Sequence, residues 1–187
     1  MRVFVAVEIA EDARRAAEKT GEALRRSVDP HLRASWIAPV NMHLTVRFIG
    51  HVADDRLASV LGALTPPLRM DPFDVELGGC GAFPSSGTPR VIWIGVTEGL
   101  PSLSLMHDEF DRRLAPLGWE PEKRPFSAHL TLARVKSASR PAAALLRQTI
   151  REIPALHARW RVDRATILRS HLSPRGARYE PLGHVVL

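Results

Sequence analysis

Some segments of the chain are short apolar or alternating runs typical of strands, and others carry apolar residues every three to four positions, as helices do. This pattern predicts short strands interleaved with helices. Residues 3–8 form a valine-rich run typical of a strand, and the charged segment 11–26 that follows carries apolar residues at helical spacing. A turn-rich stretch at 84–89 separates two strand-like runs and indicates a hairpin with a long loop. The other predicted strands cover 42–49, 73–83, 90–96, 128–135, 160–168 and 179–187, and the other predicted helices 54–64, 103–117 and 141–150.

These elements predict an α+β fold, with antiparallel sheets and helices on their outer faces. A linker rich in Gly, Pro or Ser does not divide the chain, so residues 1–187 are expected to form a single domain. Within it, one short pattern occurs twice. Residues 43–46 read His-Leu-Thr-Val, and residues 129–132 read His-Leu-Thr-Leu. With 8 His and 8 Thr in the chain, roughly 0.07 such motifs are expected by chance, so two copies indicate a duplicated functional element.

Both copies lie in predicted strands, where residues two apart share a face. His43 and Thr45 are therefore expected on one face, with Leu44, Val46 and Phe48 turned into the core. If a pseudo-two-fold axis relates the two halves, the fold is bilobal and the two His–Thr pairs face each other across a central cleft.

Such a cleft would hold two imidazoles, which titrate near neutral pH, so one can act as a base while the other acts as an acid. Threonine hydroxyls can hydrogen-bond phosphate oxygens that gain charge in a transition state. The constellation suits phosphodiester chemistry without a metal. Two histidines could also coordinate zinc, but neither motif has a carboxylate or thiol nearby at ligand spacing.

Charge placement agrees with a phosphate-rich partner. The formal net charge is +6, and residues 123–178 contain 13 basic and 2 acidic residues. Since 23 of the 26 basic residues are Arg, genomic base composition is an alternative cause. The N-terminal apolar run is too short and too acidic for a signal peptide, and a single cysteine, Cys80, cannot build a disulfide framework. We therefore expect a cytoplasmic protein that does not associate with membranes.

Several segments together resemble one known family, the two-histidine (2H) phosphoesterases, and within it the RNA 2′,3′-cyclic phosphodiesterases, historically called 2′-5′ RNA ligases. The resemblance covers nearly the whole chain. It rests on the opening strand at 2–7, the two motif regions at 36–50 and 126–134, and a C-terminal signature from Leu168 to Tyr179. Ala128 stands where the family often has Pro, and Val46 where Leu is frequent.

The resemblance implies metal-independent, cofactor-free hydrolysis of a terminal 2′,3′-cyclic phosphate to a 2′-phosphate. His43 would be the proton donor to the leaving 3′-oxygen, and His129 the proton acceptor that activates water. Thr45 and Thr131 would hold phosphate oxygens. Arg134 matches a basic position of the family, although strict strand alternation points it away from His129, so a phosphate-binding role for it requires a bulge or a strand end.

Other interpretations stay open. The acid and base labels could be exchanged, because the two motifs are nearly equivalent. Arg47 shares the expected face of His43 and is an alternative phosphate contact, and Trp36 or Phe126 could stack on a base. The partner is expected to be RNA with a 2′,3′-cyclic phosphate end or a related nucleotide, and the protein a monomer. RNA 2′-5′ ligation and a non-catalytic RNA-binding module are the alternative functions.

Overall fold

The computed structural model of the protein describes residues 1–28, 32–173 and 176–187, and most of the predicted elements recur in it with small shifts of their ends. The strands are β1 Arg2–Glu8, β2 Leu32–Trp36, β3 His43–His51, β4 Phe73–Phe83, β5 Val91–Glu98, β6 His129–Ala138, β7 Ala158–Val162, β8 Arg164–Ser173 and β9 Gly176–Val186. The helices are α1 Glu11–Val28, α2 Leu57–Leu64, α3 Leu100–Leu114 and α4 Arg140–Glu152, with short 3₁₀ turns at Pro39–Asn41, Asp54–Arg56 and Ala115–Leu117.

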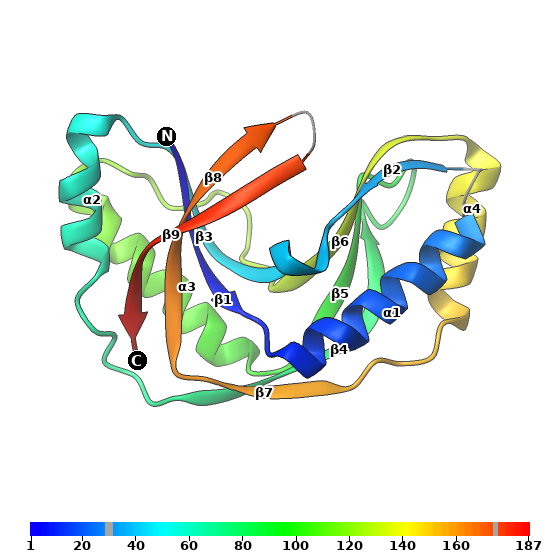
Figure 1. Cartoon of the computed structure of the whole chain (residues 1–187), viewed down its shortest axis with the longest axis horizontal. Coiled ribbons are helices and arrows are strands. Elements are labelled where there is room, and N and C mark those ends of the chain that lie inside the picture. Colours follow the sequence, from blue (N-terminus) through cyan, green and yellow to red (C-terminus); the bar gives the residue numbers. More distant parts are fainter. Residues whose placement is uncertain (29–31, 174–175) are drawn as a thin grey trace.

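All the described strands belong to one curled antiparallel sheet, in the order β7-β4-β5-β6-β3-β1-β8-β9, with β2 paired to β6 (Figure 1). The strands β3 and β6, which carry the two motifs, meet at its centre. They pair only at Leu44 and Leu130, whereas β1 and β3 pair along the whole length of β1. The expected antiparallel sheets are thus the two halves of one sheet, joined at a single residue pair between the motifs.

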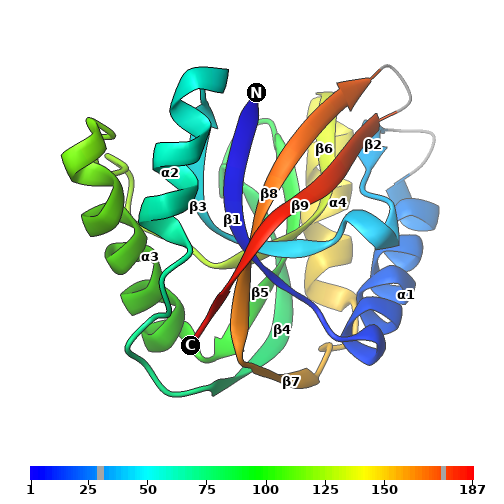
Figure 2. The ribbon, with the colours of Figure 1, turned by 60° about the vertical axis from the view of Figure 1, so that its left-hand side comes forward.

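The two halves repeat one pattern of connections. In one half the chain runs β1-α1 and then β3-α2, and in the other it runs β5-α3 and then β6-α4. The first helix of each repeat crosses over, because α1 packs against α4 and β7 of the other half, while α3 packs against α2 and β3. The helix pairs α2/α3 and α1/α4 therefore lie at opposite ends of the molecule (Figures 1 and 2). The predicted bilobal α+β architecture is confirmed.

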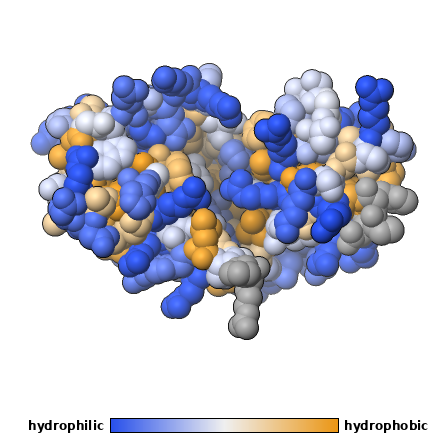
Figure 3. Space-filling model, turned by 90° about the horizontal axis from the view of Figure 1, so that it is seen from above, coloured by the Kyte–Doolittle hydropathy of each residue, from blue (hydrophilic) through white to orange (hydrophobic). Residues whose placement is uncertain are grey.

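The helices follow from their apolar spacing. In α3, the side chains of Leu103, Met106, Phe110 and Leu114 are fully buried, as the sequence pattern predicts, and Gly118 ends the following turn with a φ of 83°. None of the described helices has both the length and the apolar character that a membrane crossing requires. Seen from above, the surface is hollowed between the two ends of the molecule (Figure 3).

The sequence pattern misses one strand, β2, and wrongly predicts one continuous strand over 160–168. β2 is five residues long and alternates exposed with covered positions on the flank of β6. The single strand expected over 160–168 is divided at Asp163 into β7, which pairs with β4, and β8, which pairs with β1. The chain passes from one half of the sheet to the other at this point, and residues 160–168 contain no Gly or Pro that would mark the break.

Candidate active site

Each motif strand contains a β-bulge at the fourth position of its motif. In β3 the register against β1 passes from Thr45 to Arg47 and skips Val46. In β6 the register against β5 passes from Thr131 to Ala133 and skips Leu132. Because a bulge shifts the alternation of side chains by one position, the residues beyond it change faces.

In β6 the bulge returns Arg134 to the face of His129 and Thr131. Arg134 is exposed, and its positive charge affects the pKa of His43 on β3. Burial is the main reason that the pKa of His43 lies below its ordinary value, and the positive charges of Arg134 and His129 act in the same direction. Burial likewise raises the pKa of Tyr179, an effect that Arg134 opposes. The bulge that a phosphate-binding role for Arg134 requires is therefore present.

In β3 the same bulge overturns two expectations. Phe48, expected in the core, is 45% exposed, and Arg47, expected beside His43 as a phosphate contact, is only 4% exposed. The Arg47 guanidinium forms ion pairs with Asp111 and Glu122 instead. Strict alternation fails here because one extra residue lies between Thr45 and Arg47.

The two motifs lie side by side in opposite directions. Leu44 pairs with Leu130 across the centre of the sheet. Since the strands are antiparallel, one step along β3 matches one step back along β6, which puts His43 level with Thr131 and Thr45 level with His129. The four polar side chains therefore alternate across one face, as the pseudo-two-fold interpretation predicts.

Both histidines are anchored in the same way. Nδ1 of His43 donates to the carbonyl of Asn41 over 2.8 Å, and Nδ1 of His129 donates to the carbonyl of Ser127 over 2.7 Å. A carbonyl oxygen can only accept, so each neutral ring carries its proton on Nδ1 and leaves Nε2 as the accepting nitrogen. In the first motif Nε2 accepts from the Thr45 hydroxyl at 3.2 Å.

Aromatic rings enclose His43 more closely than His129. The ring centroids of Phe4 and Tyr179 lie 4.9 and 5.1 Å from that of His43, whereas Phe83 lies 5.2 Å from His129 with its edge toward the imidazole. Phe4 is buried, and its ring packs against His43. Tyr179 belongs to the C-terminal signature, and its position beside His43 comes from the pairing of β9 with β8 and β8 with β1.

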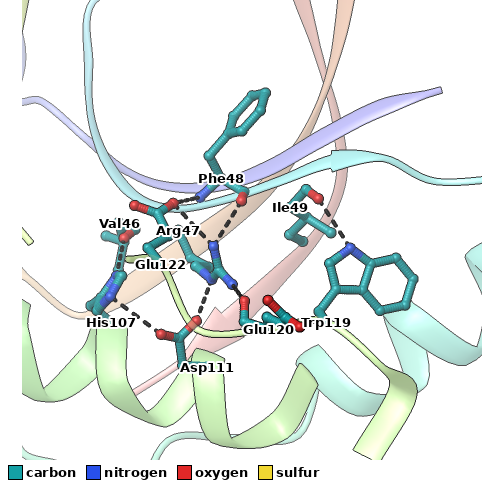
Figure 4. A network of polar contacts seen from close by, with 9 residues as sticks. All are labelled: Val46, Arg47, Phe48, Ile49, His107, Asp111, Trp119, Glu120 and Glu122. Carbon is teal, nitrogen blue, oxygen red and sulfur yellow. Dashed lines mark hydrogen bonds and ion pairs between the residues drawn. The ribbon is translucent and has the colours of Figure 1, made fainter. Parts of the chain in front are cut away.

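A buried polar network supports β3 from the side of α3 (Figure 4). In addition to its ion pairs, Arg47 donates to the backbone carbonyls of Phe48 at 3.0 Å and Glu120 at 2.7 Å. His107 of α3 donates through Nδ1 to the carbonyl of the bulge residue Val46 at 2.8 Å. Trp119 donates to the carbonyl of Ile49 at 3.0 Å. Side chains thus bind the backbone of β3 where the bulge interrupts its regular pairing.

The network also reaches the second motif. The ring of Phe126, three residues before His129, stacks on His107 with centroids 4.7 Å apart and planes 18° apart. One face of Phe126 is therefore covered by protein. Trp36, the other stacking candidate, packs half-buried against the core. Burial raises the pKa of the Cys80 thiol to about 11, which disfavours the reactive thiolate.

Among residues 1–28, 32–173 and 176–187, no three His, Cys, Asp or Glu side chains gather as a metal-binding group. The strand register puts the two histidines and two threonines on one face, Tyr179 lies against His43, and the charge of Arg134 acts on His43. This set can exchange protons at two positions and hold an anion between them.

Comparison with known proteins places the chain in a family. The family model described as the 2′-5′ RNA ligase superfamily matches residues 4–174. An RNA 2′,3′-cyclic phosphodiesterase of Archaeoglobus fulgidus is 33% identical over 189 residues, covering 97% of this chain and 98% of the relative. One from Methanothermobacter thermautotrophicus is 30% identical over 181 residues, covering 96% and 95%.

Solved structures agree with this assignment. The protein TT0787 of Thermus thermophilus superposes with a TM-score of 0.78 at 26% identity, covering 100% of this chain and 98% of that one. The fold is also that of E. coli LigT complexed with 3′-AMP, with a TM-score of 0.72 at 24% identity and coverage of 100% and 97%. The family match spans most of the chain, and the full-length relatives reach 30% identity or more. The chain therefore belongs to the 2′-5′ RNA ligase superfamily.

Proposed function

We propose that this protein hydrolyses RNA 2′,3′-cyclic phosphate ends to 2′-phosphomonoesters by metal-independent acid/base catalysis. The observation that carries the proposal is the antiparallel placement of the two motifs, which brings two Nδ1-anchored imidazoles and two threonines to one face. The names of the full-length relatives agree with this reaction.

In the proposed reaction, Nε2 of His129 accepts a proton from water as the water oxygen attacks phosphorus. The bond from phosphorus to the 3′-oxygen breaks, and His43 donates the proton that the 3′-oxygen takes up. Thr45, Thr131 and Arg134 bind the non-bridging oxygens, on which charge builds up in the transition state.

The environment of His43 fits a proton donor that becomes charged when substrate binds. In the free protein, burial and the positive charge of Arg134 lower the pKa of His43. A bound phosphodiester brings a negative charge that offsets the charge of Arg134 and favours the protonated imidazole. His43 would then gain its proton together with the substrate.

The test is hydrolysis of an RNA oligonucleotide with a 2′,3′-cyclic phosphate end, in EDTA, with the 2′- and 3′-phosphate products resolved. The wild-type chain should yield the 2′-phosphate, and His43→Ala and His129→Ala should each abolish turnover. RNA binding without turnover in the wild type would favour the binding-module alternative. Loss of activity in EDTA that a divalent metal restores would overturn the metal-independent mechanism.

A further inference from the structure

The carbonyl of each bulge residue is held by a donor from outside the strand pair that contains the bulge. In β6 the Leu132 carbonyl accepts from the backbone N–H of Ile37, one residue beyond the end of β2, over 2.8 Å. In β3 the Val46 carbonyl accepts from Nδ1 of His107 on α3, also over 2.8 Å (Figure 4). The first donor is a backbone group that any residue except proline supplies, whereas the second is one particular side chain.

Ile37 links the bulge of the second motif to the segment that leads into the first motif. It lies between β2 and the 3₁₀ turn Pro39–Asn41. The carbonyl of Asn41 is the one that accepts from Nδ1 of His43. The position of the Leu132 carbonyl is thus coupled, through a short stretch of backbone, to the group that anchors His43.

His107 makes the corresponding link in the opposite direction. Its Nδ1 donates to the bulge of the first motif, and its ring face stacks on Phe126 with centroids 4.7 Å apart and planes 18° apart. Phe126 directly precedes Ser127, whose carbonyl accepts from Nδ1 of His129 over 2.7 Å. His107 is only 5% exposed, and its Nε2 lies 3.5 Å from Oδ2 of Asp111. Contacts at both nitrogens and at one face therefore hold this ring in place.

We propose that His107 is a positioning residue that sets the place of His129 relative to the first motif. It is buried, so it acts through Phe126 and the Ser127 carbonyl rather than on the substrate. The inference rests on the proposed function, in which both imidazoles must reach the same phosphodiester at once. A misplacement of about 1 Å can lower a rate by roughly 10²-fold, so loss of the His107 ring should lower kcat. KM should change little, because the groups proposed to bind the phosphate are untouched.

Two substitutions at His107 separate its contacts. His107→Asn removes the ring but keeps an amide donor for the Val46 carbonyl, and His107→Phe keeps a ring for the stack but loses the donor. Phe126→Leu removes the stack from the other side. With an RNA that ends in a 2′,3′-cyclic phosphate, His107→Asn and Phe126→Leu should each lower kcat by about tenfold and change KM by less than about twofold.

Double variants test whether the stack is the cause of these losses. Phe126→Leu should cause no further loss of kcat in the His107→Asn background, because the stack is already absent there. In the His107→Phe background, which keeps a ring for the stack, the same substitution should lower kcat by about tenfold. Single variants with wild-type kcat, or equal losses from Phe126→Leu in both backgrounds, would overturn the inference.

Phe110→Leu is the matched control for general destabilisation. Phe110 is fully buried on the same helix and takes no part in the stack, so its truncation lowers stability while His107 and Phe126 stay together. Urea denaturation measures the stability of each variant. Phe110→Leu should keep kcat within about twofold of the wild type. A fall in kcat that follows the loss of stability across all variants, Phe110→Leu included, would contradict a positioning role.

A second readout needs no substrate. Hydrogen bonds decide which nitrogen of a neutral imidazole carries the proton, and ¹⁵N chemical shifts distinguish a protonated nitrogen from a bare one. In the free wild-type protein, at a pH where both rings are neutral, Nδ1 should carry the proton in His43 and His129. His107→Asn should reduce the fraction of His129 protonated at Nδ1 and leave that of His43 unchanged. An unchanged His129 would overturn the inference, whereas absence of hydrolysis in the wild type would overturn the proposed function instead.

Discussion

The strands β3 and β6 carry the same four-residue pattern and the same bulge, yet the two residues that follow differ in kind. Beyond the bulge β3 places Arg47 inside and Phe48 outside, whereas β6 places the small Ala133 inside and Arg134 outside. The arginine of the first strand is held in a buried ion-pair network, and that of the second is exposed and lowers the pKa of His43. The same bulge thus gives a buried, ion-paired arginine in one half and an exposed arginine in the other.

The comparison shows that the bulge decides what each residue type can do. A residue two positions after the bulge residue returns to the face of the motif histidine only because the extra residue shifts the alternation. A charged residue directly after the bulge residue points into the interior, where it requires partners. Asp111 of α3 and Glu122 supply these partners to Arg47.

The largest expected effect separates the two histidines by role. With the natural oxygen substrate, His43→Ala and His129→Ala should each lower kcat/KM by about 10²–10⁴-fold. With a substrate whose bridging 3′-oxygen is replaced by sulfur, a thiolate leaves without needing a proton. His43→Ala should then recover most of its activity, and His129→Ala should not. Recovery in His129→Ala instead would exchange the acid and base labels.

The buried cation of β3 should contribute to stability. Arg47→Met leaves the carboxylate of Asp111 buried without its main cation, which should lower the free energy of unfolding by about 3–5 kcal/mol. Urea denaturation measures the loss. The double variant with Asp111→Leu should regain part of the stability, because it removes the stranded charge. A single variant as stable as the wild type would show that Arg47 is not needed to hold the bulged strand.

The exposed cation of β6 should contribute to catalysis. Arg134→Gln removes a charged donor from the developing phosphate charge, so kcat/KM should fall by roughly 10²-fold with little loss of stability. The control is Arg33→Gln on β2, whose side chain is exposed on the strand flanking β6; this variant should stay within about twofold, since exposed charges away from the phosphate are screened. Equal losses in both variants would mean that only the overall charge matters.

The smallest expected effect is a shift in titration. Arg134 is one of the cations that lower the pKa of His43, so Arg134→Gln should raise the pKa of His43 in an NMR titration, while burial still keeps it below the ordinary value. The sign carries over to stability. A lowered pKa means that the unfolded chain binds a proton more readily than the folded one, so the contribution of His43 to stability falls as pH drops below about 6.5. The variant should weaken that dependence, and an unchanged pKa of His43 would place Arg134 too far away to act on the site.

Much of the geometry of the candidate site could be predicted before the structure was known. The duplication of His-x-Thr singled out both histidines and both threonines as candidates, and each pair was expected on one face because side chains two residues apart along a strand point to the same side. The same rule failed beyond the bulge of β3, for Arg47 and Phe48, because the pattern of apolar and polar residues does not reveal an extra unpaired residue. For Arg134, the sequence showed that a phosphate-binding role requires a bulge, but it did not show that the bulge exists.

The sequence by itself determined most of the elements, the apolar faces of the helices and the repeated chemistry of the two motifs, because these follow from spacing within a few residues. Only the tertiary structure decided which residues far apart in the chain meet. In the folded chain α1 and α3 each pack against the opposite half, Tyr179 lies beside His43, and Arg47 pairs with the carboxylates of Asp111 and Glu122. It also set Gly95 against His129 where Glu8 stands against His43. Such pairings depend on the register and curvature of the whole sheet, which local patterns along the chain do not contain.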